Sequence, residues 1–171
     1  MILLKTQRLY LRNVTSEDVP IMQDYRNHEA CARYQRGQTK DYAGIAELVE
    51  RHKNRKLNLE EPVLVAVALK QTNEMIGEIV VMPNKPTISL GYTFHYAYHR
   101  KGYAFEALSA LIEKLHEDYP EWEFISLVEP ENVPSIALLK KLGYEDMGYV
   151  TQLESQMFGR WAIPEETESK E

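Results

Sequence analysis

Cysteine is almost absent from this sequence, because Cys31 is the only one among its 171 residues. A single thiol can form neither an internal disulfide nor a cysteine zinc site. A reactive cysteine needs a basic group that lowers its pKa, and no histidine or basic cluster convincingly fills that role for Cys31. We therefore interpret Cys31 as a small packing residue and not as a nucleophile.

Long hydrophobic runs are also missing. The apolar start at residues 1–4 is followed at once by Lys5, Arg8 and Arg12, so it is shorter than the core of a signal peptide. No run approaches the roughly 20 apolar residues that a membrane-spanning helix needs. We expect no membrane association and a cytoplasmic location.

The sequence has no excess of basic residues: 20 Lys and Arg are outnumbered by 26 Asp and Glu, for a net charge of −6. This balance argues against a nucleic-acid binder, whose affinity rests on cations that neutralise phosphates. It is compatible with a cationic substrate.

A length of 171 residues fits one domain. We expect that domain over residues 1–163, followed by an acidic, flexible tail over residues 164–171.

Alternating and helical patterns of apolar residues divide the chain into short strands and helices. Thr15 and Asp18 have the spacing of a capping box, and Gly143 follows the end of a helix that Asn132 begins. The expected strands are 8–14, 63–69, 75–82, 87–95, 123–128, 144–153 and 157–163, and the expected helices start near 19 or cover 42–54, 104–115 and 132–142. This order predicts an α/β fold of the α+β kind, with antiparallel and parallel parts in one mixed sheet.

The segment Phe94–Leu108 joins a strand directly to a helix through a short turn. Free backbone N–H groups at a helix start form a natural phosphate site. Gly102 lets the backbone approach an anion closely, Ala104 leaves room beside it, and Arg100 and Lys101 add positive charge. One glycine and one alanine make a weak motif, so a plain strand-to-helix connection remains an alternative for this segment taken alone.

A second segment, Val128–Tyr144, places Asn132 at a helix start and Gly143 just past the helix end. By itself it is typical of any well-capped helix.

Five motifs in order resemble the GNAT superfamily of N-acetyltransferases, and in particular its branch that acetylates the N-termini of ribosomal proteins. The resemblance covers residues 6 to about 150. The motifs are Thr6-Gln7-Arg8-Leu9-Tyr10-Leu11-Arg12, Ile76-Gly77, Gly91-Tyr92-Thr93-Phe94, Lys101-Gly102-Tyr103-Ala104-Phe105-Glu106-Ala107, and Pro130-Glu131-Asn132 with Ser135 and Lys141-Leu142-Gly143-Tyr144.

The resemblance implies a GNAT-like domain whose mainly antiparallel sheet splays between two central parallel strands and is flanked by helices. It also implies roles for individual residues. Ser135 would protonate the departing thiolate of coenzyme A, and Asn132 would bind the pantetheine arm. The other residues implied to contact the cofactor are the strand backbone at Tyr92, Thr93 and Phe94, the loop at Arg100, Lys101, Gly102, Tyr103 and Ala104, and Lys141.

Two departures from the family pattern concern the loop and the general base. His99 and Arg100 replace the residues usual at the first loop positions. Many members carry a carboxylate on the strand before Gly91, where this sequence has Ile88 and Ser89. We take Glu78 as the first candidate for the base that deprotonates the amine. The alternatives are Glu129, His95 and a chain of water molecules.

No metal is required for this chemistry, and we expect no metal site. His95 and His99 are four residues apart, a spacing that aligns side chains on a helix, but here it spans a strand end and a loop.

The sequence therefore predicts an enzyme that transfers an acetyl group directly from acetyl-CoA to a primary amine, with a protein or peptide N-terminal α-amine as the favoured acceptor. Two alternatives remain open: an acetyltransferase for a small amine such as a polyamine, antibiotic or amino acid, and a non-catalytic module that binds acyl-CoA. We expect the chain to act as a monomer or a homodimer, without nucleic acid.

Overall fold

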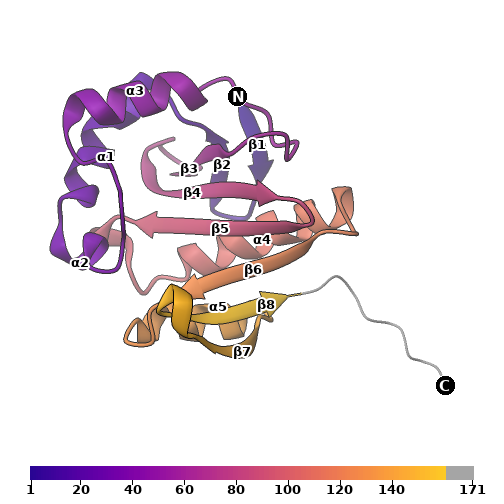
Figure 1. The fold of residues 1–171 in the computed structure, drawn as a ribbon. Helices are drawn as coiled ribbons and strands as arrows, with labels where there is room; N and C mark the ends of the chain where they lie inside the picture. Colours follow the sequence, from indigo (N-terminus) through magenta and orange to yellow (C-terminus); the bar gives the residue numbers. More distant parts are fainter. Residues whose placement is uncertain (161–171) are drawn as a thin grey trace.

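A computed structural model describes residues 1–160 of the chain. Its eight strands form one sheet in the order β1-β2-β3-β4-β5-β6-β8-β7 (Figure 1). The strands are β1 (Ile2–Lys5), β2 (Leu9–Asn13), β3 (Val63–Leu69), β4 (Met75–Asn84), β5 (Thr87–Phe94), β6 (Glu123–Val128), β7 (Glu145–Val150) and β8 (Ser155–Arg160). The α-helices are α1 (Val19–Arg26), α2 (Glu29–Ala32), α3 (Tyr42–His52), α4 (Tyr103–Asp118) and α5 (Val133–Lys141). The expected tail at 164–171, and the expected end of the last strand at 161–163, lie outside the described residues.

All neighbouring strands run antiparallel except β5 and β6. These two pair only through Thr87 with Glu123 and Ile88 with Phe124. Beyond Ile88 they diverge towards their carboxyl ends, at the left of Figure 1. The predicted fold class is confirmed, including the splay between two central parallel strands.

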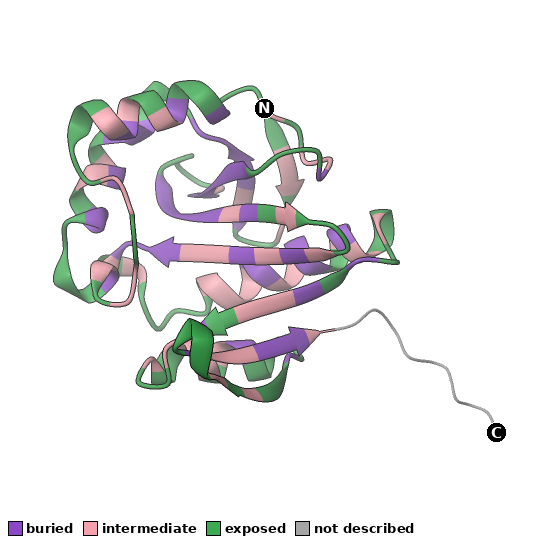
Figure 2. Cartoon of the chain, viewed as in Figure 1, coloured by how far each residue is buried: buried purple, intermediate pink, exposed green. Residues whose placement is uncertain are grey.

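Two cores cover the two faces of the sheet. Side chains of α4 pack with one face, and those of α1 and α3 pack with the other. The strand β3 contributes to both cores, and six of its seven residues are buried (Figure 2). Its continuous apolar run therefore does mark a strand that is covered on both faces.

The capping box before α1 is present as the spacing predicts. Asp18 Oδ2 accepts a hydrogen bond from the Thr15 backbone N–H at 2.8 Å. The same carboxylate accepts two hydrogen bonds from Arg12, at 2.9 and 3.0 Å, and both side chains of this ion pair are buried. Arg12, the last residue of the first motif, thus connects β2 to the start of α1.

Two elements were not expected from the sequence. Strand β1 lies at the edge of the sheet, where Leu3 and Leu4 are only half-buried and no alternation of apolar and polar residues is visible. Helix α2 is one short turn inside the polar stretch 27–40 and is too short for a helical period to be recognised. Among residues 1–160, no helix is long and apolar enough to cross a membrane.

Stability should depend on pH through His52, at the end of α3. His52 is buried, and its Nδ1 accepts a hydrogen bond from the Leu64 N–H at 3.1 Å. Burial, together with the charges of Arg55 and Arg51, lowers the pKa of His52 to about 4. The unfolded chain takes up this proton near pH 6.5, whereas the folded chain keeps the ring neutral. Stability therefore decreases as the pH falls from 6.5 towards 4, by about 2 kcal/mol at pH 5.

Urea denaturation at pH 7 and pH 5 measures this change. The His52→Gln variant retains a group that can accept a hydrogen bond from Leu64 but does not titrate. Its free energy of unfolding should therefore decrease less between pH 7 and pH 5 than that of the unmodified protein. His28→Gln, at an exposed position, is the control and should behave like the unmodified protein. An identical loss in all three proteins would contradict the assignment to His52.

Candidate active site

The turn before α4 has the backbone geometry of an anion site. Gly102 adopts a left-handed conformation with φ 82°, which glycine accepts without strain, and Arg100 is left-handed as well, with φ 64°. The first intrahelical bond of this turn runs from the Glu106 N–H to the Gly102 carbonyl at 3.0 Å. The N–H groups of residues 103–105 come before it and have no partner within the helix, so they can donate to a phosphate.

Three groups from the N-terminal segment fix the first turn of α4 to β2. Glu106 Oε2 accepts hydrogen bonds from Thr6 Oγ1 at 2.5 Å and from the Arg8 N–H at 2.8 Å, and Glu106 Oε1 accepts from Arg8 Nε at 2.6 Å. Arg8 Nη1 also donates to the Lys101 carbonyl at 3.1 Å, and the guanidinium lies 4.2 Å from the centre of the Tyr103 ring. These contacts, which we call the loop clamp, hold both sides of the turn.

Electrostatics favour an ionised Glu106 in the loop clamp. Burial by itself would raise the pKa of Glu106, but the hydrogen bonds from Thr6 and Arg8 and the charge of Arg8 leave that pKa below its ordinary value. The sequence motif contained Thr6, Arg8 and Glu106 without indicating that they meet, because they are about 100 residues apart.

Lys141 reaches the same region from the end of α5. Its Nζ lies 4.4 Å from the centre of the Phe105 ring, in the first turn of α4. The structure therefore brings Lys141 close to the loop of Arg100, Lys101 and Gly102, and this side of the cleft carries several cations in a protein that is acidic overall.

The backbone of β5 faces the open cleft beyond Ile88. The His95 N–H donates to Ile76 on the β4 side, so by alternation Thr93 also points its backbone groups to β4, while Tyr92 and Phe94 point theirs into the cleft. The Phe94 carbonyl accepts from His99 Nε2 at 2.7 Å, which explains how a histidine fits the first loop position. The Tyr92 carbonyl accepts from Gln35 Nε2 at 3.1 Å.

Ser135 lies in the first turn of α5, on the other side of the cleft from β5. Asn132 caps this helix, with its amide oxygen 3.4 Å from the Ser135 backbone N–H. That bond uses only the oxygen of the Asn132 amide, so its NH₂ group can donate to a ligand. The hydroxyl of Ser135 is 2.6 Å from the phenol oxygen of Tyr92. The structure thus brings Asn132, Ser135 and Tyr92 together.

Residues 34–38, which we call the strap, join the two sides of the cleft. Gln38 Nε2 donates to Thr93 Oγ1 at 3.0 Å on the β5 side, where Gln35 also binds. On the α5 side, the Tyr34 hydroxyl donates to the Glu131 carbonyl at 3.2 Å, and Arg36 pairs with Glu129 at 2.9 Å. Sequence reasoning found no motif in this stretch, because its contacts depend on a loop conformation.

Glu78 lies on β4 opposite Thr93 and is almost fully buried. Arg26 donates to both of its carboxylate oxygens, at 3.1 and 2.7 Å, and the Tyr25 hydroxyl donates to Oε1 at 2.5 Å. Burial and the neighbouring Glu78 raise the pKa of Tyr25 well above its ordinary value, so the phenol stays protonated. The Glu78 carboxylate is thus paired with Arg26 and Tyr25 in the folded chain, and its role as base stays a prediction.

The other two side chains considered as the base, His95 and Glu129, differ in how many of their polar atoms already have a partner. His95 Nδ1 accepts from the Ala97 N–H at 3.0 Å, so a neutral ring carries its proton on Nε2, which is 3.1 Å from Asp24 Oδ2. Both nitrogens are therefore engaged. Glu129 directly follows β6 and is partly exposed, with one oxygen paired to Arg36.

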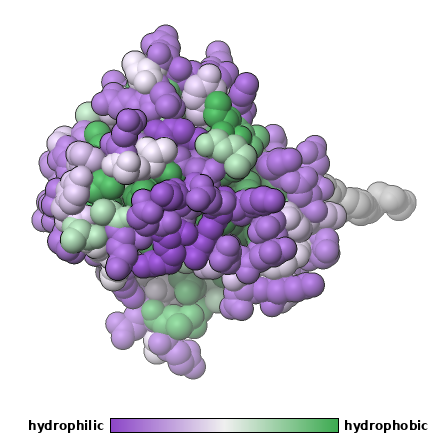
Figure 3. Space-filling view, turned by 90° about the horizontal axis from the view of Figure 1, so that it is seen from above, coloured by the Kyte–Doolittle hydropathy of each residue, from purple (hydrophilic) through white to green (hydrophobic). Residues whose placement is uncertain are grey.

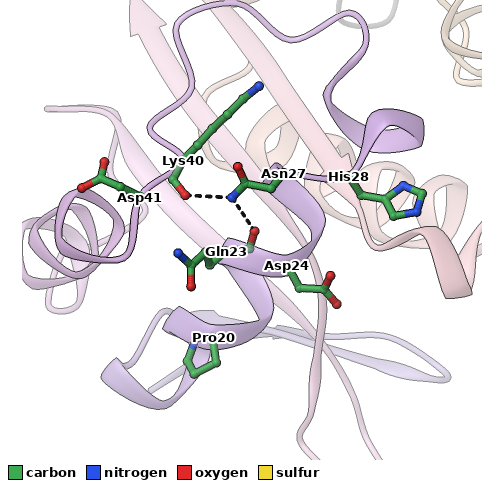
Figure 4. Close-up of a pocket in the computed structure, with 7 residues that line it drawn as sticks. All are labelled: Pro20, Gln23, Asp24, Asn27, His28, Lys40 and Asp41. Carbon is green, nitrogen blue, oxygen red and sulfur yellow. Dashed lines mark hydrogen bonds between the residues drawn. The ribbon is translucent and has the colours of Figure 1, made fainter.

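A separate hollow lies between α1 and the segment before α3 (Figure 4). Asn27 Nδ2 crosses it to donate to the carbonyls of Gln23 and Lys40, both at 2.8 Å. None of the residues predicted to bind the cofactor lines this hollow.

Seen from above, the surface is mainly hydrophilic, with apolar side chains between the polar ones (Figure 3). In the described part of the chain, no group of three or more His, Cys, Asp or Glu side chains is placed to hold a metal.

A sheet that opens between two parallel strands, with a helix start at one edge of the opening, is the architecture that the five motifs imply. A family model described as the acetyltransferase (GNAT) domain matches residues 8–145. The chain therefore belongs to the GNAT acetyltransferase family and is an acyltransferase.

Curated relatives and solved structures agree with this assignment. The "Uncharacterized N-acetyltransferase YnaD" of Bacillus subtilis is 33% identical over 85 residues, 48% of this chain and only about half (50%) of that relative's length. The "Uncharacterized N-acetyltransferase p20" of Bacillus licheniformis is 26% identical over 156 residues, 88% of this chain and 86% of that protein. RimL, a ribosomal L7/L12 alpha-N-protein acetyltransferase, is similar in structure. Its complex with coenzyme A has a TM-score of 0.79 at 16% identity, and the match covers 95% of this chain and 98% of RimL. Its apo form has a TM-score of 0.77.

Disrupting the loop clamp should weaken the binding of acetyl-CoA. In Glu106→Gln, the side-chain NH₂ would face N–H donors of Arg8 or the hydroxyl of Thr6, and the charge would be lost. A hydrogen bond to a charged group contributes about 1.5–3 kcal/mol, so we expect the KM for acetyl-CoA to rise about tenfold or more.

Steady-state kinetics and the melting temperature should be measured on the same samples. Glu113→Gln, exposed and two turns further along α4, is the matched control. If Glu106→Gln lowers the melting temperature but leaves the KM for acetyl-CoA unchanged, the loop clamp supports only the fold.

Proposed function

We propose that this protein transfers the acetyl group of acetyl-CoA directly to a primary amine, and that its acceptor is the N-terminal α-amine of a protein or peptide. The observation that carries the proposal is the opening between β5 and β6. It has an anion-binding helix start at Gly102 on one side and the Ser135 hydroxyl, in contact with Tyr92, across it.

The residues around the opening fit the parts of acetyl-CoA. The N–H groups of residues 103–105, with Arg100, Lys101 and Lys141 nearby, suit the phosphates. The cleft-facing backbone of Tyr92 and Phe94 suits the amides of the pantetheine arm, because an extended chain can pair there as an added strand. In this structure the Tyr92 carbonyl accepts from Gln35, and the Phe94 carbonyl accepts from His99 and Cys31, so the arm would have to share or replace these bonds.

Ser135 would act as the proton donor to the departing sulfur. When bound, acetyl-CoA supplies an activated acetyl group, which an amine held about 3 Å away can attack. The chain then has two tasks: one group accepts a proton from the amine nitrogen, and another gives a proton to the sulfur. Ser135 is the hydroxyl in position for the second task. We propose Glu129 or an ordered water for the first, because Glu78 and His95 are engaged with other partners.

The acceptor would enter from the side of the strap. Gln38 Oε1 is buried and has no hydrogen-bond partner among residues 1–160, and a buried carbonyl oxygen favours an N–H donor as its partner. RimL is a protein α-amine acetyltransferase with the same fold, which supports this choice at the level of analogy.

Release of the coenzyme A thiol with a panel of amines tests the proposal. The panel should contain short peptides with different first residues, N-terminally blocked copies, polyamines and free amino acids. Thiol release with peptides that disappears on blocking supports the proposed acceptor. Release with small amines alone favours the small-molecule alternative. No release with any amine, despite a rise in melting temperature with acetyl-CoA, indicates a non-catalytic module.

Replacing Ser135 by alanine should lower kcat and spare the fold. Help from a general acid is worth about 10²–10⁴ in rate, so we expect kcat to fall about a hundredfold. The KM for acetyl-CoA should stay within a few-fold, since the phosphate contacts are untouched. The helix cap uses the backbone N–H of Ser135, which alanine retains, so the melting temperature should change little. Ser109→Ala on α4 is the control, and an unchanged kcat in Ser135→Ala would leave the proton donor unassigned.

A further inference from the structure

The side chain of Tyr92 has no part in the roles proposed so far, which use only its backbone. Its phenol oxygen lies 2.6 Å from Ser135 Oγ, a short contact for two neutral hydroxyl groups. The two residues come from elements on opposite sides of the opening, β5 and α5, and are 43 positions apart. Tyr92 lies four residues beyond Ile88, where the parallel pairing ends, so the contact bridges strands that no longer bind each other.

The direction of this hydrogen bond follows from the acidity of the two groups. A phenol is far more acidic than an aliphatic hydroxyl and is the better donor. Burial raises the pKa of Tyr92 above its ordinary value of about 10, although the bond to Ser135 partly opposes this shift. The phenol therefore keeps its proton at neutral pH and donates it to Ser135 Oγ. The hydrogen of the Ser135 hydroxyl is then free to point elsewhere.

Without Tyr92, the Ser135 hydroxyl would have other choices. Serine in the first turn of a helix readily bonds to neighbouring backbone groups. Here the Ser135 backbone N–H donates to the amide oxygen of Asn132, so the Ser135 hydroxyl takes no part in capping the helix. Tyr92 is the partner of the hydroxyl within the described residues. One lone pair of Ser135 Oγ is thus occupied from the β5 side, which restricts the rotation of the hydroxyl.

We propose that Tyr92 is a positioning residue: its phenol holds Ser135 Oγ so that the Ser135 hydroxyl hydrogen is directed at the sulfur of coenzyme A. This inference rests on the proposed function of Ser135. In the step itself, the Ser135 O–H bond breaks as the S–H bond forms, and the proton of the more acidic Tyr92 phenol moves to Oγ, so that Ser135 is restored and the negative charge ends on the phenol oxygen. The amine nitrogen gives up one proton when it is acetylated, and this proton, carried by solvent, restores Tyr92, so protons balance.

Kinetics of four proteins test the inference: the unmodified chain, Tyr92→Phe, Ser135→Ala and the double variant. The acceptor is the best substrate of the amine panel. Tyr92→Phe should lower kcat about tenfold, with the KM for acetyl-CoA within about threefold. The double variant should have the kcat of Ser135→Ala, because Tyr92 acts only through the serine and the two changes then fail to add. Tyr119→Phe, a half-buried tyrosine packed on Trp122, is the control and should be unaffected.

A binding measurement without turnover separates this inference from the proposed function. Calorimetry at pH 9, where much of the free thiol is ionised, compares coenzyme A with desulfo-coenzyme A. The unmodified chain should prefer coenzyme A, and both Tyr92→Phe and Ser135→Ala should reduce that preference to the same level. If this holds but no amine is acetylated, the proposed function fails and the positioning role stands.

Two results would overturn the positioning role. One is a Tyr92→Phe variant with unchanged kcat and unchanged preference for coenzyme A. The other is a Tyr92→Phe effect of equal size with and without Ser135. A lowered melting temperature with normal kinetics would make the Tyr92 contact purely structural.

Discussion

The early end of the pairing between β5 and β6 is the constraint on which the site depends. Two residue pairs join these parallel strands, and beyond Ile88 each strand presents backbone groups to the gap. In an ordinary sheet those groups would be consumed by the ladder, because a buried N–H or C=O without a partner is costly. Here the gap instead collects partners from outside the sheet: Gln35 binds the Tyr92 carbonyl and His99 binds the Phe94 carbonyl.

The opening remains in place because both of its sides are fixed from elsewhere. On the β5 side, the antiparallel ladder with β4 runs the full length of β5, from Thr87 to Phe94. On the β6 side, β8 pairs along β6 from Phe124 to Val128. The α4 layer packs across both strands with a continuous apolar stripe. The sheet therefore parts at one place while its two halves stay rigid, which suits a site that has to hold reacting groups at fixed distances.

Charge is organised around the opening in a way that net charge does not reveal. The chain is acidic overall, yet Arg8, Arg100, Lys101 and Lys141 gather at the start of α4, with Glu106 paired to Arg8. The carboxylates Glu129 and Glu131 belong to the turn between β6 and α5, beside the strap. The start of α4 is therefore locally positive in a chain that is negative overall, and local fields of this kind act more strongly than the overall charge.

Local patterns in the sequence were enough to locate most of the helices and strands. Patterns of apolar residues located β3 and α4, because each has a long or regular stripe that reflects its burial. Gly102 and Asn132 were recognisable because turn and cap chemistry is local, whereas Ser135 was implied only by the resemblance to the GNAT family. Strand β1 and helix α2 were missed, since one is a four-residue edge strand and the other a single turn.

Which of these residues come into contact depends on how the helices and strands pack. The contacts of Arg8 with Glu106, Tyr92 with Ser135 and Arg26 with Glu78 join positions 98, 43 and 52 residues apart. No local pattern encodes such a distance, because each partner is set by how strands and helices stack. The same stacking placed Glu78 in a buried ion pair, where residue type alone had suggested a base. Local chemistry can be read from the order of residues, whereas the availability of a proton donor or acceptor depends on what the fold brings beside it.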